Sequence, residues 1–323
     1  MIKKIFITDY VGLSTRLEAL ATAFLISEKF GHQVCIDWLE ADALTVDGTR
    51  KGNRGLLGRL NSIKLKEDWP DKFSSLANYT NINLRTHHGP EHLLGQRYLS
   101  TAKRVKLRSD LIEVIKDTFN VYRDRPLVGV HIRRGDFPLV NPDRFDVNAS
   151  EWPAVPDWWY EHVMSEIQKC WPDVAFFVSC SGSLNDFPKL QAKFDMFDLP
   201  VASPYINIYH GHAAARHPAT DLFALACCRT LIGSPCSTFT HYAANMLGES
   251  TQILVPPSQP MIESEAAFFS VKLFGKSAAR WYAACREGHD AERVTELNTL
   301  DLGKGASLDW LQGRDASAAH AAR

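Results

Sequence analysis

The pattern of apolar and polar positions predicts a strand, a helix and a second strand at the start of the chain. Residues 3–8 (KKIFIT) form a short apolar run typical of a strand. Residues 15–31 carry apolar side chains at helical spacing and end in Gly31, and residues 33–38 (QVCIDW) indicate the next strand. This order defines a βαβ unit, so we expect a parallel sheet with a binding crevice at the carboxyl ends of its strands.

A second α/β series follows a helix predicted at 108–123 and the polar, proline-containing stretch RDRP. Strands are predicted at 127–132, 174–180, 230–234 and 251–256, and helices at 156–170, 183–194, 219–228, 237–247, 264–274 and 276–294. Residues 47–103 are less periodic, and we predict only loops and short helices there. Two successive α/β sheets that face a cleft fit this series better than one very wide sheet.

The expected organisation is therefore two Rossmann-like domains. We assign residues 1–124 to the first and 125–275 to the second, with 302–323 as a small, polar tail. A helix at about 276–300 is a candidate to pack back on the first domain.

Composition narrows the classes of function. The chain has 323 residues, 45% of them hydrophobic, and a formal net charge of -1. This balance excludes a generally basic nucleic-acid surface and a polybasic membrane anchor, so any anion site must be local. Because no apolar run is long enough to span a bilayer and the N-terminus lacks a cleavage signal, we expect a cytoplasmic protein.

The cysteine pattern bears on whether the chain contains disulfides or a zinc site. The seven cysteines are odd in number, lie mostly in apolar runs and form no CxxC pair. Buried thiols are favoured over a disulfide or zinc framework.

The most informative motif is HIRRGD, which follows the strand at 127–132. Strand alternation puts His131 and Arg133 on one side, and Asp136 is placed to pair with an arginine or to accept backbone N–H groups at the turn. A fixed guanidinium suits an anionic oxygen, phosphate above all. The alternatives are an internal ion pair that ties the strand end to a helix, or an exposed Arg-Gly-Asp adhesion signal.

A second cluster, SPCSTFT, places the hydroxyls of Ser234, Ser237, Thr238 and Thr240 ahead of an apolar helix. Hydroxyls and backbone N–H groups at such a position can bind an anion, although helix capping by serine or threonine is the commoner explanation. Together the two motifs suggest a diphosphate held between Arg133 and the start of this helix.

These motifs resemble the donor-site motifs of the GDP-fucose-dependent fucosyltransferase superfamily, which includes α1,6-, α1,2- and protein O-fucosyltransferases. The stretch DLFALACCRTLIGSPCSTFTHYA is most similar to the rhizobial enzymes that fucosylate Nod factor. The N-terminal GLSTRLEALATAFLISEKFGHQVCIDW resembles the group's opening Gly-x-x-x-Arg-Leu loop and helix. The resemblance covers three separated segments in the expected order, from residue 12 to about 247. It implies a GT-B arrangement of two Rossmann-like domains.

The resemblance also implies roles for single residues. His131 would contact the guanosine of GDP, and Arg133 would hold the β-phosphate and the departing oxygen. Asp221 would bind the guanine edge, and Ser237 and Thr238 would lie at the diphosphate. Arg16, in the N-terminal loop, would lie near the pyrophosphate or the acceptor.

Two features depart from the family pattern. Ser179, Cys180 and Ser181 stand where relatives often carry acidic residues, and the opening loop has fewer glycines than many relatives. Both bear on the identity of the donor sugar.

The expected reaction is metal-independent, inverting transfer of L-fucose from GDP-fucose to a glycan or lipid-linked oligosaccharide, with Arg133 stabilising the leaving diphosphate. No Asp-x-Asp pair stands in a suitable loop, and no cofactor other than the donor substrate is expected. Asp9, Asp143 and Asp146 are candidate bases. A lipid-linked acceptor would bring the protein into peripheral contact with a membrane.

Other functions fit the sequence less well. The histidine clusters at 87–92 and 210–217 lack the ligands that would complete a metal site, and no P-loop or GxGxxG motif is present. Trp158, Trp159 and Tyr160 are expected to pack in the core. The alternatives to a fucosyltransferase are a transferase of the same fold that uses another nucleotide sugar, and a non-catalytic phosphate- or glycan-binding protein.

Overall fold

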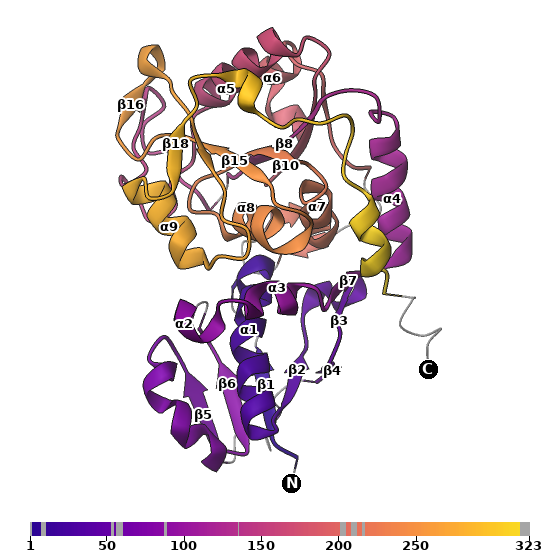
Figure 1. The fold of residues 1–323 in the computed structure, drawn as a ribbon, viewed down its shortest axis with the longest axis vertical. Helices are drawn as coiled ribbons and strands as arrows, with labels where there is room; N and C mark the ends of the chain where they lie inside the picture. Colours follow the sequence, from indigo (N-terminus) through magenta and orange to yellow (C-terminus); the bar gives the residue numbers. More distant parts are fainter. Residues whose placement is uncertain are drawn as a thin grey trace. The chain divides into compact units, whose positions relative to one another are not determined.

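The structure is a computed structural model that describes residues 2–7, 11–52, 55, 61–86, 89–134, 136–200, 205–207, 212–214 and 217–316. The chain forms two compact units. The first consists of Met1–Arg108, Gly275–Ser277 and Arg314–Arg323, and the second of Ser109–Phe274 and Ala278–Gly313. Both contain parallel β-sheet, as the strand and helix order predicts (Figure 1).

The first unit is built on a five-stranded sheet of order β4-β2-β1-β6-β5 in which all neighbours pair in parallel. Its strands are β1 (Lys4–Ile7), β2 (Gln33–Ile36), β4 (Thr49–Lys51), β5 (Ser62–Leu65) and β6 (Asn81–Leu84). Helix α1 (Leu13–Phe30) crosses from β1 to β2 and packs on both, and it ends at Gly31 with a left-handed φ of 71°. The predicted opening βαβ unit is therefore present.

Short elements complete this unit. They are the 3-10 helices η1 (Leu39–Asp42) and η3 (Trp69–Asn78), the helices α2 (Glu91–Leu94) and α3 (Arg97–Ala102), and the antiparallel strands β3 (Leu44–Val46) and β7 (Val105–Leu107). Strands β4, β5 and β6 fall within residues 47–103, where the sequence predicted only loops and short helices. That prediction was wrong because these strands have only three or four residues, too few to show a periodicity.

The second unit contains a seven-stranded sheet of order β11-β10-β8-β14-β15-β17-β18. Its strands are β8 (Leu127–Ile132), β10 (Ala175–Cys180), β11 (Met196–Phe197), β14 (Thr230–Ile232), β15 (Gln252–Val255), β17 (Phe269–Val271) and β18 (Ala291–Arg293). The first five of these pair in parallel, whereas β17 and β18 add antiparallel strands at one edge. Strand β8 is central and fully buried. Gly129 in β8 permits this packing, because an added Cβ would collide with the side chain of Leu231.

The helices and minor strands of the second unit surround this sheet. The helices are α4 (Ser109–Asn120), α5 (Asp157–Cys170), α6 (Pro188–Gln191), α7 (Pro218–Leu225), α8 (Thr238–Tyr242) with the π-turn η5 (Ala243–Leu247), and α9 (Ala278–Glu287). The short 3-10 turns are η4 (Leu184–Asp186), η6 (Glu263–Glu265), η7 (Leu297–Thr299) and η8 (Asp309–Arg314). Two small antiparallel pairs are formed by β9 (Arg144–Phe145) with β16 (Met261–Ile262) and by β12 (Tyr205–Asn207) with β13 (His212–Ala214). Helix α7 contacts β8 and β10.

The compact units differ from the domain ranges expected from the sequence. Helix α4 belongs to the second unit, so the division falls at residue 108 and not at 124. Helix α9 also belongs to the second unit and contacts α8. The chain returns to the first unit through Gly275–Ser277 and from Arg314 onwards.

Two predicted helices near the C-terminus are partly strand. Residues 264–274 were expected to be helical, but they contain β17, in which Val271 pairs with Ile253 of β15. The second helix, expected at 276–294, ends at Glu287, before the left-handed Gly288 (φ 79°). The chain then forms β18. In both places pairing at the sheet edge overrides a weak helical pattern.

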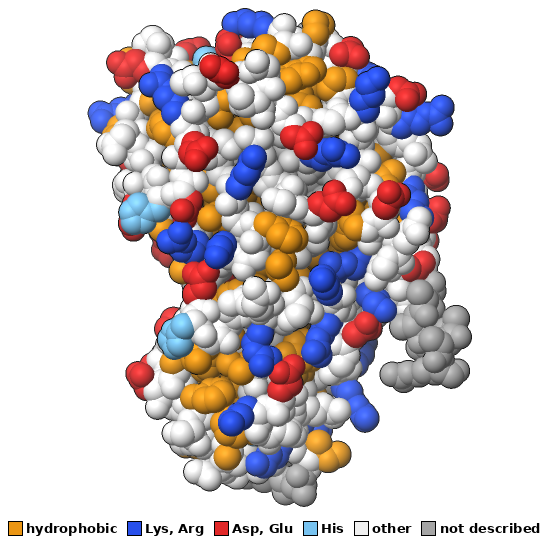
Figure 2. Space-filling model, viewed as in Figure 1, with side chains coloured by type: hydrophobic (Ala, Val, Ile, Leu, Met, Phe, Trp, Pro, Cys, Tyr) orange, Lys and Arg blue, Asp and Glu red, His pale blue; other side chains and the backbone are white. Residues whose placement is uncertain are grey.

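The charge on the surface and the burial of the cysteines can be compared with what the composition predicts. On the face shown in Figure 2, acidic and basic side chains are interspersed. All seven cysteines are free, and five of them are buried. Among the described residues, no helix has both the length and the apolar content needed to span a bilayer.

Candidate functional site

The residues of HIRRGD lie at the carboxyl end of β8, beside the ends of its two parallel neighbours. His131 pairs in register with Ser179 of β10, and Val130 pairs with Ile232 of β14. The loops that follow the three strands therefore meet at one edge of the sheet. This edge is where open α/β sheets bind ligands.

Ser234 joins the ends of β8 and β14. Its hydroxyl donates to the carbonyl of His131 at 2.9 Å and accepts the backbone N–H of Arg133 at 2.9 Å. The Tyr160 hydroxyl of α5 also donates to the His131 carbonyl, at 3.2 Å. Tyr160 is fully buried, as expected, and burial raises its pKa to about 12. The backbone that carries Arg133 is thus fixed by hydrogen bonds to the His131 carbonyl and from the Arg133 N–H.

His131 itself is buried, with 3% of its surface exposed. Its Nδ1 lies 2.7 Å from Oγ1 of Thr240, and Thr240 donates to the Ser234 carbonyl at 3.3 Å. This pattern assigns the imidazole proton to Nδ1, because the Thr240 oxygen is left to accept it. Burial, and after it the charge of Arg133, lowers the pKa of His131 to about 3. His131 is therefore a neutral hydrogen-bonding group near neutral pH.

Arg133 forms a two-point ion pair with Asp136. Nε donates to Oδ1 at 2.9 Å and Nη2 to Oδ2 at 2.7 Å, which confirms that Asp136 pairs with an arginine. Cζ of Arg133 also lies 5.3 Å from the centre of the Phe137 ring. The pair is partly exposed, at 25% for Arg133 and 30% for Asp136. Within the described part of the chain, Nη1 of Arg133 makes no hydrogen bond, so one guanidinium edge can meet an anion.

Arg134 has the structural role that we considered as the alternative for this motif. Its Nη2 donates to Asp157 at the first turn of α5, and Cζ lies 5.9 Å from the centre of the Phe187 ring. Arg134 ties the strand end to a helix, and Arg133 lies in the loop.

The SPCSTFT segment connects β14 to α8 through a left-handed turn. Cys236 has a φ of 58°, and its backbone N–H lies 3.4 Å from the Cys285 sulfur of α9. The Ser237 carbonyl accepts a hydrogen bond from the Trp281 indole at 3.1 Å. Ser237 precedes α8, but its side chain makes no capping hydrogen bond. The capping explanation for this serine is therefore not realised.

Asp221 and Ser179 form a second buried polar contact at this edge. The Ser179 hydroxyl donates to Oδ2 of Asp221 at 2.9 Å, and the two residues are 3% and 6% exposed. Asp221 lies in the first turn of α7, which His217 caps by accepting the Ala219 N–H on Nδ1. Residue 179, where the sequence lacks the family's acidic group, thus supports the carboxylate of Asp221.

Arg16 lies in the first unit, where it pairs with Glu40. Its Nη2 donates to both Glu40 oxygens, at 2.8 and 3.0 Å, and its Nε donates to the Val11 carbonyl. The side chains are 1% and 2% exposed. Trp38 covers the guanidinium at 5.0 Å. Sequence reasoning missed Glu40, which has no motif around it.

The other candidates are distributed as follows. Of the candidate bases, Asp143 is exposed, Asp146 is partly exposed and Asp9 lies outside the described residues. The structure also does not describe His87, His88, His210 and the side chain of His212. Among the residues that the structure describes, no group of three His, Cys, Asp or Glu side chains could hold a metal ion.

Comparison with known proteins identifies the class of fold. No family model matches the sequence, and no curated protein matches it. Solved structures do match, and fucosyltransferases are among them. The expected resemblance is thus confirmed at the level of the fold, a mixed α/β architecture with parallel sheets.

Three solved structures illustrate the match. Fucosyltransferase NodZ from Bradyrhizobium has 16% identity and a TM-score of 0.51, over 81% of this chain and 100% of that one. NodZ α-1,6-fucosyltransferase soaked with GDP-fucose has 15% identity and a TM-score of 0.51, and the match covers 84% of this chain and 100% of that one. POFUT1 in complex with GDP has 11% identity and a TM-score of 0.50, and the match covers 78% of this chain and 97% of that one.

Proposed function

We propose that this protein is a fucosyltransferase that moves L-fucose from GDP-fucose to a glycan or a lipid-linked oligosaccharide. The observation that carries the proposal is the Arg133–Asp136 ion pair at the carboxyl edge of a parallel sheet, where Ser234 and Tyr160 hydrogen-bond the backbone that carries Arg133. The fold is the one found in NodZ and POFUT1, whose structures were determined with GDP or GDP-fucose. Fold likeness alone does not assign an activity, so the site residues carry the argument.

Arg133 is proposed to stabilise the leaving group. As the bond between fucose C1 and the diphosphate oxygen breaks, negative charge grows on that oxygen. A preorganised guanidinium nearby lowers the energy of this state, and one such group typically contributes about 3 kcal/mol. With Arg133 in this role, we propose that transfer inverts the configuration at C1 and proceeds without a metal ion.

The acceptor hydroxyl would attack C1 from the face opposite GDP. Its oxygen forms the new C1–O bond, and its proton passes to a base or to solvent. Asp143 and Asp146 lie in the loop that follows Arg133 and Asp136 in sequence, so they remain the described candidates for this base.

The remaining site residues are proposed to hold the donor. Asp221, supported by Ser179, would accept hydrogen bonds from the N1–H and amino group of guanine. Ser237 and Thr238 would donate to the diphosphate, and His131 would contact the guanosine as a neutral group. Arg16, which is held by its buried pair with Glu40, would lie near the pyrophosphate or the acceptor.

The GT-B arrangement is part of the same proposal. The second unit would bind GDP-fucose and the first unit the acceptor, across a cleft. The free thiols fit a reducing compartment such as the cytoplasm, where a lipid-linked acceptor would bring the protein to a membrane surface.

Calorimetric titration of GDP, UDP and ADP tests the donor. We expect GDP to bind more tightly than either of the others, because only guanine presents two adjacent donors to Asp221. Tighter binding of UDP or ADP would favour a transferase that uses another nucleotide sugar. Binding of GDP without turnover on any acceptor would indicate a binding protein, and absence of nucleotide binding would reject every transferase assignment.

A further inference from the structure

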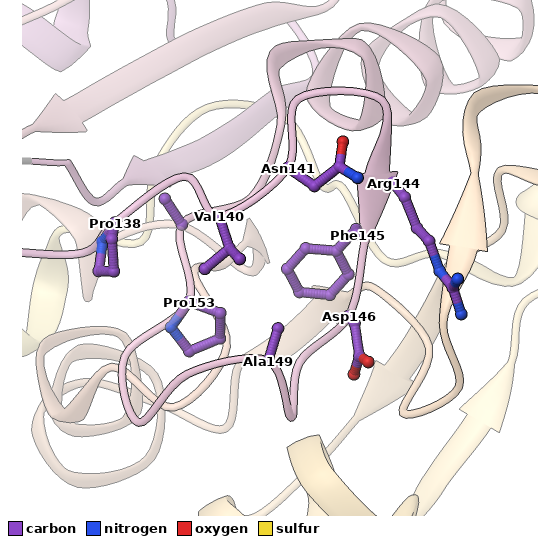
Figure 3. A pocket seen from close by; sticks show the side chains of 9 residues that line it. Pro138, Val140, Asn141, Arg144, Phe145, Asp146, Ala149 and Pro153 are labelled. Carbon is purple, nitrogen blue, oxygen red and sulfur yellow. The ribbon is translucent and has the colours of Figure 1, made fainter.

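The segment between residues 138 and 154 lines a half-open cavity of about 280 Å³ in the second unit. Figure 3 shows the Phe145 ring beside Val140, Ala149 and Pro153. Phe145 is 2% exposed, so its ring forms part of the buried floor of the cavity. Asn141, Arg144 and Asp146 add polar side chains to the wall (Figure 3). The cavity thus combines an apolar floor with a polar rim.

The walls of the cavity are tied together at both ends of the segment. The Ala154 N–H donates to the Pro138 carbonyl at 3.1 Å, which closes the loop at its base. The Trp158 indole donates to the Pro142 carbonyl at 2.8 Å. A cavity with fixed walls binds a ligand without a large cost in ordering the loop.

Two other elements of the second unit hold the far side of the segment. Arg286 of α9 donates to the carbonyl of Val147 at 3.0 Å and to that of Ser150 at 3.3 Å. Strand β9 also pairs with β16, which lies more than a hundred positions later in the chain. The cavity is therefore preformed by several elements and is not the interior of a free loop.

The cavity follows directly from the residues of the proposed donor site. Pro138 lines it and comes immediately after Phe137, whose ring lies below the Arg133 guanidinium. The Phe137 ring is also 5.9 Å from that of Trp152, the residue before Pro153 in the cavity wall. A ligand in this cavity would therefore contact a wall that continues into Phe137, whose ring packs against the Arg133 guanidinium.

The lining fits one chemical class of ligand. A pyranose ring has apolar C–H faces and hydroxyls around its rim, which matches exposed proline and valine side chains beside amide, guanidinium and carboxylate groups. Asp146 uses one carboxylate oxygen to accept the Asn148 N–H at 2.9 Å, which fixes the side chain and leaves the second oxygen to accept a hydroxyl. The volume lies just below the range of about 300–1,000 Å³ for drug-sized ligands, so it suits a single ring.

We infer that this cavity is a subsite for one sugar ring of the acceptor. The inference rests on the proposed fucosyltransferase function, and it places part of the acceptor-binding surface in the second unit. It also gives Asp146 a role as a binding residue that receives a sugar hydroxyl.

The test uses two matched tryptophan substitutions at neighbouring exposed positions. Val140 lines the cavity and is 58% exposed, whereas Leu139 is 44% exposed and does not line it. Val140→Trp should fill the cavity, and Leu139→Trp should leave it open. Thermal unfolding should be similar for both variants, because neither residue is buried.

Binding is measured by saturation-transfer NMR with methyl glycosides of glucose, galactose, mannose and N-acetylglucosamine. The concentration should reach about 20 mM, since a dissociation constant of about 1 mM corresponds to only about -4 kcal/mol. The wild type and Leu139→Trp should bind at least one glycoside, and Val140→Trp should bind it about tenfold more weakly or not at all. Asp146→Asn, which keeps an oxygen for the Asn148 N–H, should weaken binding less than Val140→Trp.

GDP titration on the same proteins separates this inference from the proposed function. Val140→Trp should bind GDP as the wild type does. Equal glycoside binding by both tryptophan variants, or no glycoside binding by the wild type, would overturn the subsite. A wild type that binds a glycoside but no GDP would reject the transferase, and with it the acceptor role of this sugar site.

Discussion

Arg133 and Asp136, three positions apart, share two hydrogen bonds of 2.9 and 2.7 Å in the loop after β8. A bidentate carboxylate fixes the plane of a guanidinium as well as its position. The pair lies at the surface, so its contribution to folding is small, about 0–1 kcal/mol. Its main consequence is that Arg133 is held in one orientation.

Asp136→Asn should therefore lower turnover with little change in stability. Asparagine keeps one acceptor but loses the charge and the second hydrogen bond to Arg133. We expect kcat to fall about tenfold, equivalent to about 1.4 kcal/mol, and the free energy of unfolding to change by less than about 1 kcal/mol. Asp124→Asn is the matched control, because Asp124 forms an exposed pair with Arg123. If both variants behaved alike, Asp136 would not position Arg133.

The buried imidazole of His131 should make stability depend on pH. Its folded-state pKa of about 3 lies below the usual value of 6.5, so between these values the unfolded chain binds a proton that the folded chain does not. The stabilisation is complete above pH 6.5 and is lost as pH falls toward 3.

Chemical unfolding of the wild type and His131→Asn at pH 7 and pH 5 measures this effect. The wild type should lose about 2 kcal/mol more than the variant over this interval. His289→Gln serves as the control, because the His289 side chain is 60% exposed and should show the wild-type dependence. An identical pH dependence in His131→Asn and the wild type would contradict a neutral, buried His131.

The Arg16–Glu40 pair should behave as a buried ion pair of the first unit. Arg16→Ala or Glu40→Gln leaves one group buried without its partner, and we expect a loss of about 3–5 kcal/mol of unfolding free energy. The double substitution Arg16→Met with Glu40→Leu should recover most of this loss. A double-mutant cycle by chemical denaturation measures the coupling. An Arg16→Ala variant of normal stability that lost GDP affinity would instead identify Arg16 as a ligand of the diphosphate.

Asp221 should determine the preference for guanine. Asp221→Asn replaces an acceptor by an amide whose donors face those of the base, so GDP affinity should fall by more than about tenfold while weak ADP binding changes little. Ser179→Ala should give a smaller loss, because it removes only the hydroxyl that orients Asp221. Titration of both nucleotides into each variant tests this. Equal losses for GDP and ADP would show that Asp221 maintains the fold and does not read the base.

The elements around the site were predictable because each has a strong local pattern. Strand β8 is a continuous apolar run, and HIRRGD at its end contains the charged and small residues of a turn. The spacing indicated that Asp136 could pair with an arginine, and the structure shows that this arginine is Arg133. The contacts of Ser234 did not, because they depend on β8 and β14 being neighbours in the sheet although they are about a hundred residues apart.

The cavity at residues 138–154 and the buried Glu40 lay beyond sequence reasoning for a related reason. The segment from Pro138 to Ala154 has no periodicity, and its shape comes from distant partners such as Arg286 and β16. Glu40 is a single acidic residue in a short helical turn. Its partner, Arg16, was expected from the resemblance to lie near the pyrophosphate or the acceptor, and its buried contacts with Glu40 and Trp38 could not be predicted from the sequence.

The most direct test of the account is GDP release from GDP-fucose in the presence of a panel of glycan acceptors, with and without EDTA. The wild type should release GDP in an acceptor-dependent reaction that EDTA does not change. Arg133→Ala should be slower by at least about a hundredfold, the loss expected for about 3 kcal/mol, while Arg123→Ala, at an exposed arginine, should retain full activity. Near-normal turnover by Arg133→Ala, or no acceptor-dependent release by the wild type, would contradict the proposed function.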